Sequence, residues 1–251
     1  MECHDAAVSY LSWVLIVLGV AFVLRHRRWC ALYGRYSPVG GPCVPARLGW
    51  FLQEVPAFLL PGLLLLLTGD ELTEPGRTLL VGTFMLHYFH RSFIYSFLTR
   101  GQPVPLRIVI FAAVFCGLNG FLQGHHLLHC AVFEHTWLTK ARITTGLLLF
   151  TVGMIINIHS DHILRNLRKP GETIYRIPRG GMFELVSGAN FFGEIVEWFG
   201  FAVAAWSLPS FAFALFTAAS IGSRALHHHR DYLQRFEDYP RSRKAVIPFI
   251  M

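Results

Sequence analysis

Long apolar segments are the feature that most constrains the fold of this chain. Seven stretches are long enough, or nearly so, to cross the roughly 30 Å hydrocarbon core of a bilayer. They lie at about 8–24, 49–68, 78–98, 105–124, 144–163, 191–208 and 209–227. Apolar residues make up 53% of the 251 residues and the mean hydropathy is +0.45, which is ordinary for a multi-pass membrane protein. We therefore predict an all-α integral membrane protein, with seven transmembrane helices in one bundle.

The basic residues predict how this bundle is oriented. If the N-terminus is outside (lumenal) and the C-terminus cytosolic, the outside connections hold only Arg77, Lys140 and Arg142, and the other basic loop residues fall inside. The first stretch leads into 25–28 (RHRR) without a small-residue cleavage site, so it reads as a retained anchor. The net charge of +7 is then a topology signal and does not suggest a nucleic-acid partner. The membrane would be the endoplasmic reticulum in a eukaryote and the inner membrane in a bacterium.

The chain shows no internal repeat and no low-complexity linker, so we expect one domain over 1–251. Within it, 1–48 would form the first helix and a cytosolic loop, and 49–251 the bundle that holds the site. The connections 25–48 and 166–189 are the longest, are rich in Gly and Pro, and lie on the predicted cytosolic side. A soluble ligand would meet them first, and 169–181 is the expected gate. We expect a monomer surrounded by membrane lipids.

The cysteines and histidines predict no metal site. The five cysteines show no CxxC or Cys/His ligand spacing, and we interpret them as free thiols. The tract at 227–229 (HHH) occupies three consecutive helix positions, which point in three directions and cannot chelate one ion together.

Polar residues recur at helical spacing inside the apolar segments. On one helix, Asn157, Asp161, Arg165 and Arg168 follow at steps of 4, 4 and 3, so they share a face. The next segment repeats the pattern with Asn190, Glu194 and Glu197 at steps of 4 and 3. Polar stripes in lipid are costly unless they line a polar cavity. The two stripes therefore predict two walls of a site for a large polar anion.

Three further helices carry polar stripes of the same kind. Their members are Trp50, Gln53 and Glu54; Tyr88, Arg91 and Tyr95; and Arg224, His228 and Tyr232. An arginine within lipid needs a partner, and Glu54 or Glu194 is available for Arg91. Each stripe alone could be a structural polar contact or a snorkelling helix end. Five stripes together favour one large cavity with a polar half near the cytosol.

Large apolar side chains near the stripes could form the other half of this cavity. They are Trp50, Phe115, Trp198 and Phe216. A cavity with a polar and an apolar half suits a soluble anionic cofactor that meets a lipophilic substrate.

Several uncommon strings in the chain resemble the steroid 5α-reductase (3-oxo-5α-steroid 4-dehydrogenase) family, from about Tyr33 to Met251. They are FLQE at 51–54, HYFHRSFIYSFLTRG at 87–101, NIHSDHILRNLRKPGE at 157–172, YRIPRGG at 175–181, ANFFGEIVEW at 189–198 and FEDYPRSRKAVIPF at 236–249. The tract HHHR at 227–230 is more similar to the type 2 isozyme than to type 1.

This resemblance implies an enzyme that uses NADPH to reduce the Δ4 double bond of a 3-oxo-Δ4-steroid such as testosterone or progesterone. Hydride would reach carbon 5 while negative charge develops on the 3-oxo oxygen. By motif, Gln53, Glu54 and Tyr88 would contact the 3-oxo group, with Tyr88 and a protonated Glu54 as donors. Trp50, Phe115 and Trp198 would line the steroid pocket. NADPH would be held by Asn157, Asp161, Arg168, Tyr175, Arg176, Asn190, Glu194, Arg224, His228 and Tyr232.

Two departures from the family pattern and three alternative functions stay open. Ser220 stands where the type 2 pattern has a bulky aromatic residue, and Gln102 where a basic residue is expected. The alternatives are a sibling reductase acting on polyprenol or enoyl-CoA, an isoprenylcysteine-type methyltransferase that uses S-adenosylmethionine, and a non-catalytic sterol or lipid binder.

Overall fold

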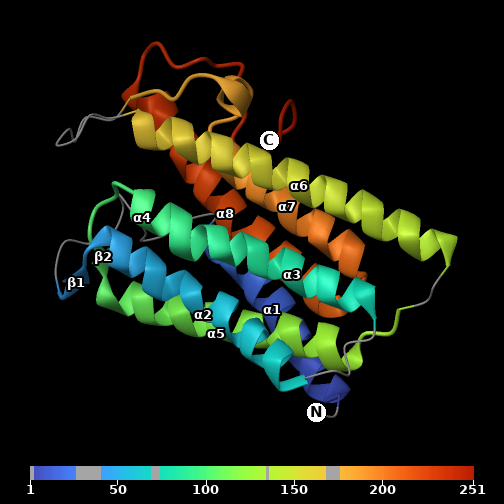
Figure 1. The fold of residues 1–251 in the computed structure, drawn as a ribbon. Helices are drawn as coiled ribbons and strands as arrows, with labels where there is room; N and C mark the ends of the chain where they lie inside the picture. The colour runs from blue at the N-terminus through green and yellow to red at the C-terminus, as the bar shows by residue number, and fades with distance from the viewer. Residues whose placement is uncertain (1–2, 27–40, 69–73, 134–135, 168–175) are drawn as a thin grey trace.

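In a computed structural model, the chain folds into a bundle of long helices that run side by side (Figure 1). The structure describes all residues except 1–2, 27–40, 69–73, 134–135 and 168–175. The elements in chain order are α1 (Asp5–His26), β1 (Cys43–Val44), α2 (Ala46–Thr68), α3 (Pro75–Phe89), η3 (His90–Tyr95), α4 (Ser96–Leu98), β2 (Val104–Pro105), α5 (Leu106–His125), η4 (His126–Cys130), α6 (Trp137–Asn166), η5 (Gly181–Glu184), α7 (Ala189–Ala205) and α8 (Leu208–Arg235).

The structure confirms the prediction of a helical membrane protein. Within the described part of the chain, four helices are long and apolar enough to cross a membrane: α1, α2, α5 continued by η4, and α6. The predicted crossings at 78–98, 191–208 and 209–227 correspond to α3–η3–α4, α7 and α8. Taken as single α-helices, α3 has 15 residues and α7 has 17, which is short for a crossing, and α8 is long enough but less apolar.

Helices α6 and α7 approach each other more closely than side chains normally allow. Gly146 and Gly153 on α6 face Gly200 and Gly193 on α7, and a Cβ atom at any of these positions would meet backbone atoms of the other helix. Small residues at such contacts let membrane helices associate tightly. This contact fixes the polar residues of α6 beside those of α7.

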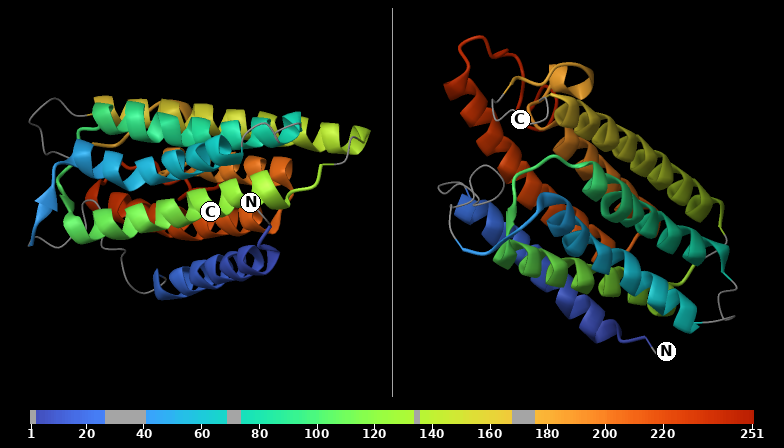
Figure 2. Two further views of the ribbon diagram at one scale, coloured as in Figure 1. Left: turned by 60° about the horizontal axis from the view of Figure 1, so that its bottom comes forward. Right: turned by 60° about the vertical axis from the view of Figure 1, so that its left-hand side comes forward.

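Two glycines of α5 lie close to the backbone of α2. A Cβ atom on Gly120 would lie 2.8 Å from the Ala57 Cα atom, and one on Gly124 would lie 3.1 Å from the Pro61 Cα atom. Helices α2 and α5 therefore form a second closely packed pair. Helix α1 lies on the outside of the bundle and packs mainly against α8 (Figure 2).

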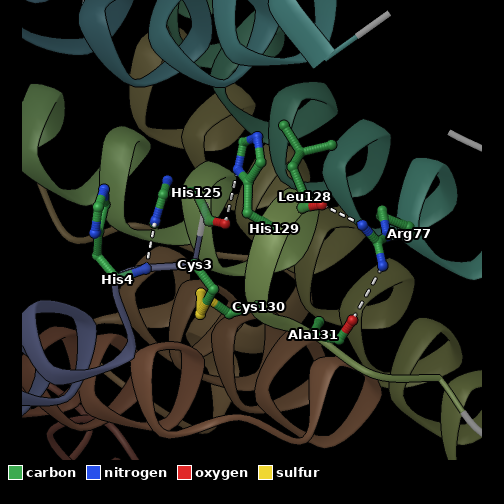
Figure 3. Close-up of a disulfide and its surroundings, with 8 residues drawn as sticks. All are labelled: Cys3, His4, Arg77, His125, Leu128, His129, Cys130 and Ala131. Carbon is green, nitrogen blue, oxygen red and sulfur yellow. Dashed lines mark hydrogen bonds between the residues drawn. A yellow bond between two sulfur atoms is a disulfide. The ribbon is translucent and has the colours of Figure 1, made fainter. Parts of the chain in front are cut away.

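Two local features differ from the sequence-based predictions. A short antiparallel pair joins β1 and β2, with Cys43 opposite Pro105 and Val44 opposite Val104, so the fold is not purely α-helical. The second difference is a disulfide bond between Cys3 and Cys130 (Figure 3), so the interpretation of all five cysteines as free thiols was wrong. The two cysteines are 127 residues apart in sequence, and no local sequence motif predicts that they pair.

The C-terminal segment closes one end of the bundle against the segment that precedes α7. The backbone of Lys244 and Ala245 accepts hydrogen bonds from Ser187 and Gly188, at 2.8 and 2.9 Å. Arg243 is buried; it donates to the Pro178 carbonyl at 2.9 Å and pairs with Glu184 at 3.1 Å. The tail thereby holds the described part of the expected gate, 176–181, in a fixed position.

Candidate active site

A cavity of about 600 Å³ lies among α1, α2, η3, α5, α6, α7 and α8. Its volume falls within the usual range of about 300–1,000 Å³ for small-molecule sites. Ten of the predicted site residues line it: Trp50, Gln53, Glu54, Tyr88, Phe115, Asp161, Asn190, Glu194, Phe216 and Arg224. The polar stripes on separate helices thus converge on one space, with Phe111, Phe213 and Ile221 adding apolar wall.

Arg91 links the polar walls of this cavity. Its Nη2 atom lies 3.4 Å from Glu54 on α2, and its Nη1 atom lies 3.3 Å from Asp161 on α6. The guanidinium carbon also lies 4.0 Å from the centre of the Tyr95 ring, within the range of a cation–π contact. Glu54 or Glu194 was the expected partner of Arg91, and the structure shows Glu54. Asp161 is a second partner that was not predicted.

A π-helical segment sets the position of Arg91. Helix α3 passes into η3 at His90, and the chain returns to α-helix at Ser96. Such widened turns occur mostly as single insertions in α-helices, often at functional sites. Here the wider turn lies between Tyr88 and Tyr95, and all three polar members of the predicted stripe, including Arg91, line the cavity.

Tyr88 and Glu54 both line the cavity. The Asn119 side-chain amide donates a hydrogen bond to the Tyr88 hydroxyl oxygen at 3.4 Å. This contact occupies the oxygen as acceptor and leaves the Tyr88 hydroxyl proton available for a ligand. Gln53 donates to the Gly49 carbonyl of its own helix at 3.0 Å. The Cys116 thiol lies 3.9 Å from the Glu54 carboxylate.

The stripes on α6 and α7 divide into cavity-lining and supporting residues. Asp161 accepts a hydrogen bond from the Asn190 side chain at 3.1 Å, and both line the cavity. Asn157 donates to the Asn190 carbonyl at 3.0 Å and supports the wall from behind. Glu197 is fully buried and binds His87 at 2.7 Å. The stripe spacing identified the helix face, but did not distinguish these roles.

The remaining residues predicted for NADPH lie at or beyond one end of the cavity. Arg224 lines it. His228 does not line it, but its ring stacks on the lining residue Phe191 at 6.0 Å. Tyr232 is buried and stacks on Tyr239 at 5.3 Å, and Arg176 is exposed in the segment before η5. Arg168 and Tyr175 lie outside the described residues, as does 169–175 of the expected gate.

Trp198 occupies a different place from the one predicted. It is 1% exposed and is not among the cavity-lining residues. Its ring packs edge-on against the lining residue Phe213 at 4.6 Å, within the core cluster of the bundle. Trp198 therefore supports the apolar wall from behind.

The two departures from the family pattern fall in different environments. Ser220 lines the cavity, so its small side chain leaves room where an aromatic ring would reduce the space. Gln102 is exposed in the short connection before β2, away from the cavity lining.

Arg91, Tyr95 and Asn119 complete the site but were not among the predicted site residues. Arg91 and Tyr95 were visible as members of a helical stripe, and Arg91 proved to be the link between two walls. Asn119 is a buried polar residue in an apolar segment, which is the signal that could have found it.

The fold and site define the class of the protein: a helical membrane protein with a cavity between its helices that is lined by both polar and apolar residues. A family model described as 3-oxo-5-alpha-steroid 4-dehydrogenase matches residues 102–251. The chain belongs to this family.

Curated relatives match along the whole chain. The 3-oxo-5-alpha-steroid 4-dehydrogenase 2 of Sus scrofa is 54% identical over 253 residues, covering 100% of this chain and 99% of the relative. The type 2 protein of Homo sapiens is 49% identical with the same coverage. The type 1 protein of Homo sapiens is 47% identical, covering 98% of this chain and 96% of the relative. The predicted resemblance to type 2 is confirmed by a small margin.

Proposed function

We propose that this membrane protein uses NADPH to reduce the Δ4 double bond of 3-oxo-Δ4-steroids such as testosterone or progesterone. The chain is a 3-oxo-5-alpha-steroid 4-dehydrogenase by family, with about 50% identity to such enzymes along its whole length. The observation that carries the cofactor and site assignment is the single cavity in which an acid–arginine network faces an apolar wall.

Tyr88 and Glu54 would stabilise the charge that develops on the 3-oxo oxygen during reduction. Donors placed where charge develops lower the barrier, because they require no rearrangement during the reaction. Asn119 orients the Tyr88 hydroxyl, so its proton can point to the substrate. The Glu54 carboxyl group, which lies 3.4 Å from Arg91, would be the second group at the 3-oxo oxygen. Gln53 would add a third polar contact beside them.

The residues on the opposite wall fit NADPH by their chemistry. Arg224 offers a planar cation suited to a phosphate, and Asn190 offers amide and carbonyl groups suited to a carboxamide or ribose hydroxyl. Arg168, Tyr175, Arg176, His228 and Tyr232 would extend this wall toward the cytosol, with Asn157, Asp161 and Glu194 at its inner end. NADPH, when bound, supplies the hydride. Trp50, Phe115 and Phe216 would hold the steroid, supported by Trp198, and exclude water from the reacting carbons.

The seven-crossing arrangement with a lumenal N-terminus and a cytosolic C-terminus is part of this proposal. The Cys3–Cys130 disulfide supports it, because disulfides persist in oxidising compartments such as the endoplasmic reticulum lumen. The cofactor wall lies at the other end of the bundle, where NADPH from the cytosol would reach it. We place the protein in the endoplasmic reticulum membrane, as a monomer without an obligate protein partner.

The decisive experiment is a product assay on membranes that contain the full chain. We expect testosterone to become dihydrotestosterone with NADPH and far less with NADH, measured by mass spectrometry of the steroid fraction. A Tyr88→Phe sample controls for host reductases, and Glu237→Gln, an exposed change, controls for expression. Conversion that is equal in the Tyr88→Phe sample would show that the host makes the product. Stabilisation by S-adenosylmethionine but not NADPH, or turnover of only polyprenol or enoyl-CoA, would replace this function with an alternative.

A further inference from the structure

A second cavity lies at the opposite end of the bundle from the active-site cavity. Its volume is about 740 Å³, and it shares no lining residue with the first. Arg142 in its wall and Asp161 in the first cavity are 19 residues apart on α6, which corresponds to about 28 Å along a helix. The two spaces are therefore separate sites, one toward each end of α6. Figure 1 shows the course of this helix along the bundle.

Arg142 gives the second cavity a positive charge that no described residue balances. None of the described lining residues is acidic, and no described carboxylate forms an ion pair with Arg142. Its Nε atom is buried and has no hydrogen-bond partner among the described residues. The Nδ1 atom of the lining residue His126 is also buried without a described partner. A cation in the wall of a cavity favours an anionic ligand there, because the ligand can supply the missing negative charge.

Two helices begin at this cavity and add to its positive character. Thr136 caps α6 and Ser207 caps α8, each by accepting a hydrogen bond from a backbone N–H, and both residues are in the lining. The positive end of each helix dipole therefore lies at the cavity wall, where it favours an anion.

Trp206 holds a backbone conformation that is unusual for a large side chain. It ends α7 with a φ of 51°, a left-handed position where glycine is the common residue. Its ring lies 5.7 Å from the Arg142 guanidinium carbon, in cation–π contact. Strained backbone persists where the surrounding structure enforces it, frequently at ligand sites. Here it keeps an aromatic wall against the cation.

We propose that this second cavity binds an anionic lipid, with the head group at Arg142 and the acyl chains along the apolar wall. Phe133, Leu138 and Leu208 supply that wall. Trp137 and Trp206 are 80% and 71% exposed at this end of the bundle, as aromatic side chains are at the level of lipid head groups. The positive charge of Arg142 favours a ligand that is an anion. The apolar wall beside it favours an anion that also carries acyl chains over a free ion.

Native mass spectrometry of the purified full chain tests this proposal. Phosphatidylserine, phosphatidylcholine with the same acyl chains, and inorganic phosphate would be titrated in separate arms. We expect tightest binding for phosphatidylserine, and a loss of about 10- to 100-fold in Arg142→Gln, as for removal of a charged hydrogen-bond donor. Leu138→Trp, which fills the apolar part at an exposed position, should weaken phosphatidylserine binding while leaving Arg142 in place.

Lys140→Gln is the matched control, because it removes the same charge from an exposed position on α6 outside the cavity lining. Equal losses in Lys140→Gln and Arg142→Gln would overturn the site in favour of general surface charge. Equal affinity for phosphatidylcholine would overturn the requirement for an anion, and equal affinity for inorganic phosphate would overturn the lipid. Retained testosterone reduction in each variant confirms that it is folded.

Discussion

The two ends of the bundle each place an arginine in a cavity, but they treat its charge in opposite ways. Arg91 in the active-site cavity has two carboxylate partners, Glu54 and Asp161, on two different helices. Arg142 in the second cavity has none among the described residues and faces an aromatic ring instead. The first arrangement fixes helices relative to one another, and the second leaves a charge for a ligand. Removing each arginine should therefore have very different consequences.

The largest expected effect is on stability, from Arg91→Gln. This change removes the cation that Glu54 and Asp161 share, and breaking a buried ion pair by removing one partner costs about 3–5 kcal/mol. Arg142→Gln orphans no carboxylate, so we expect less than about 1 kcal/mol. Denaturation of both variants in the same mixed micelles measures the difference. Equal losses would show that Arg91 does not bind the walls together.

The next effect is on turnover, from Glu54→Gln and Tyr88→Phe. Removal of one donor to a developing oxyanion reduces turnover by about 100- to 1,000-fold. NADPH binding should persist, because neither residue lies on the wall assigned to the cofactor. Single-turnover steroid reduction and an NADPH-dependent thermal shift separate the two properties. Near-normal turnover in both variants would remove the 3-oxo contact from this part of the cavity.

A smaller effect is expected from Arg224→Ala on the cofactor side. Loss of one charged hydrogen bond corresponds to about a 10-fold rise in the apparent NADPH KM. The apparent KM for the steroid should change much less, since the apolar wall is intact. Arg168→Ala, at a residue outside the described part of the chain, should act in the same direction. An unchanged NADPH dependence in both variants would count against this wall.

The smallest effect concerns Glu184, which helps to hold the closed C-terminal segment. The hydrogen bond from the Gly180 backbone N–H, together with Arg243, lowers the pKa of Glu184 below its ordinary value. A lowered pKa in the folded state adds stability above the ordinary carboxyl pKa, and this stability is lost as pH falls through the lowered value. Glu184→Gln should cost less than about 1 kcal/mol near neutral pH, because the Glu184 side chain is half exposed and Arg243 keeps its hydrogen bond to the Pro178 carbonyl. In a thermal-unfolding series, this difference should shrink toward acid pH, whereas a pH-independent difference would contradict the ionic role.

The positions of the long helices and much of the site could be predicted from sequence, because both follow from spacing along one helix. Steps of 3 and 4 placed Asp161, Asn190 and Arg91 on helix faces that now meet in one cavity. Spacing along one helix cannot tell which faces of different helices touch. The role of Asp161 as a second partner of Arg91 therefore became visible only in three dimensions.

Features that depend on long-range contact were missed for the same reason. Trp198 is an aromatic residue of the kind that lines pockets. Beside the tight α6–α7 contact, however, it packs into the core cluster of the bundle. That contact depends on glycines seven residues apart on each helix, a pattern that the sequence does not distinguish from ordinary small residues. The second cavity was not predicted, because its polar groups lie at the ends of different helices and do not recur at helical spacing along one of them.

The Cys3–Cys130 bond has a consequence for the order of events during synthesis. Its two sulfurs are separated by 127 residues, so about half of the chain must be made before the bond can close. Helix α1 packs mainly against α8, which is the last helix made. The bond can therefore secure the first helix to η4, which continues α5, before its final neighbour exists. A cell that cannot oxidise this pair would have to assemble the bundle with its first helix still untethered.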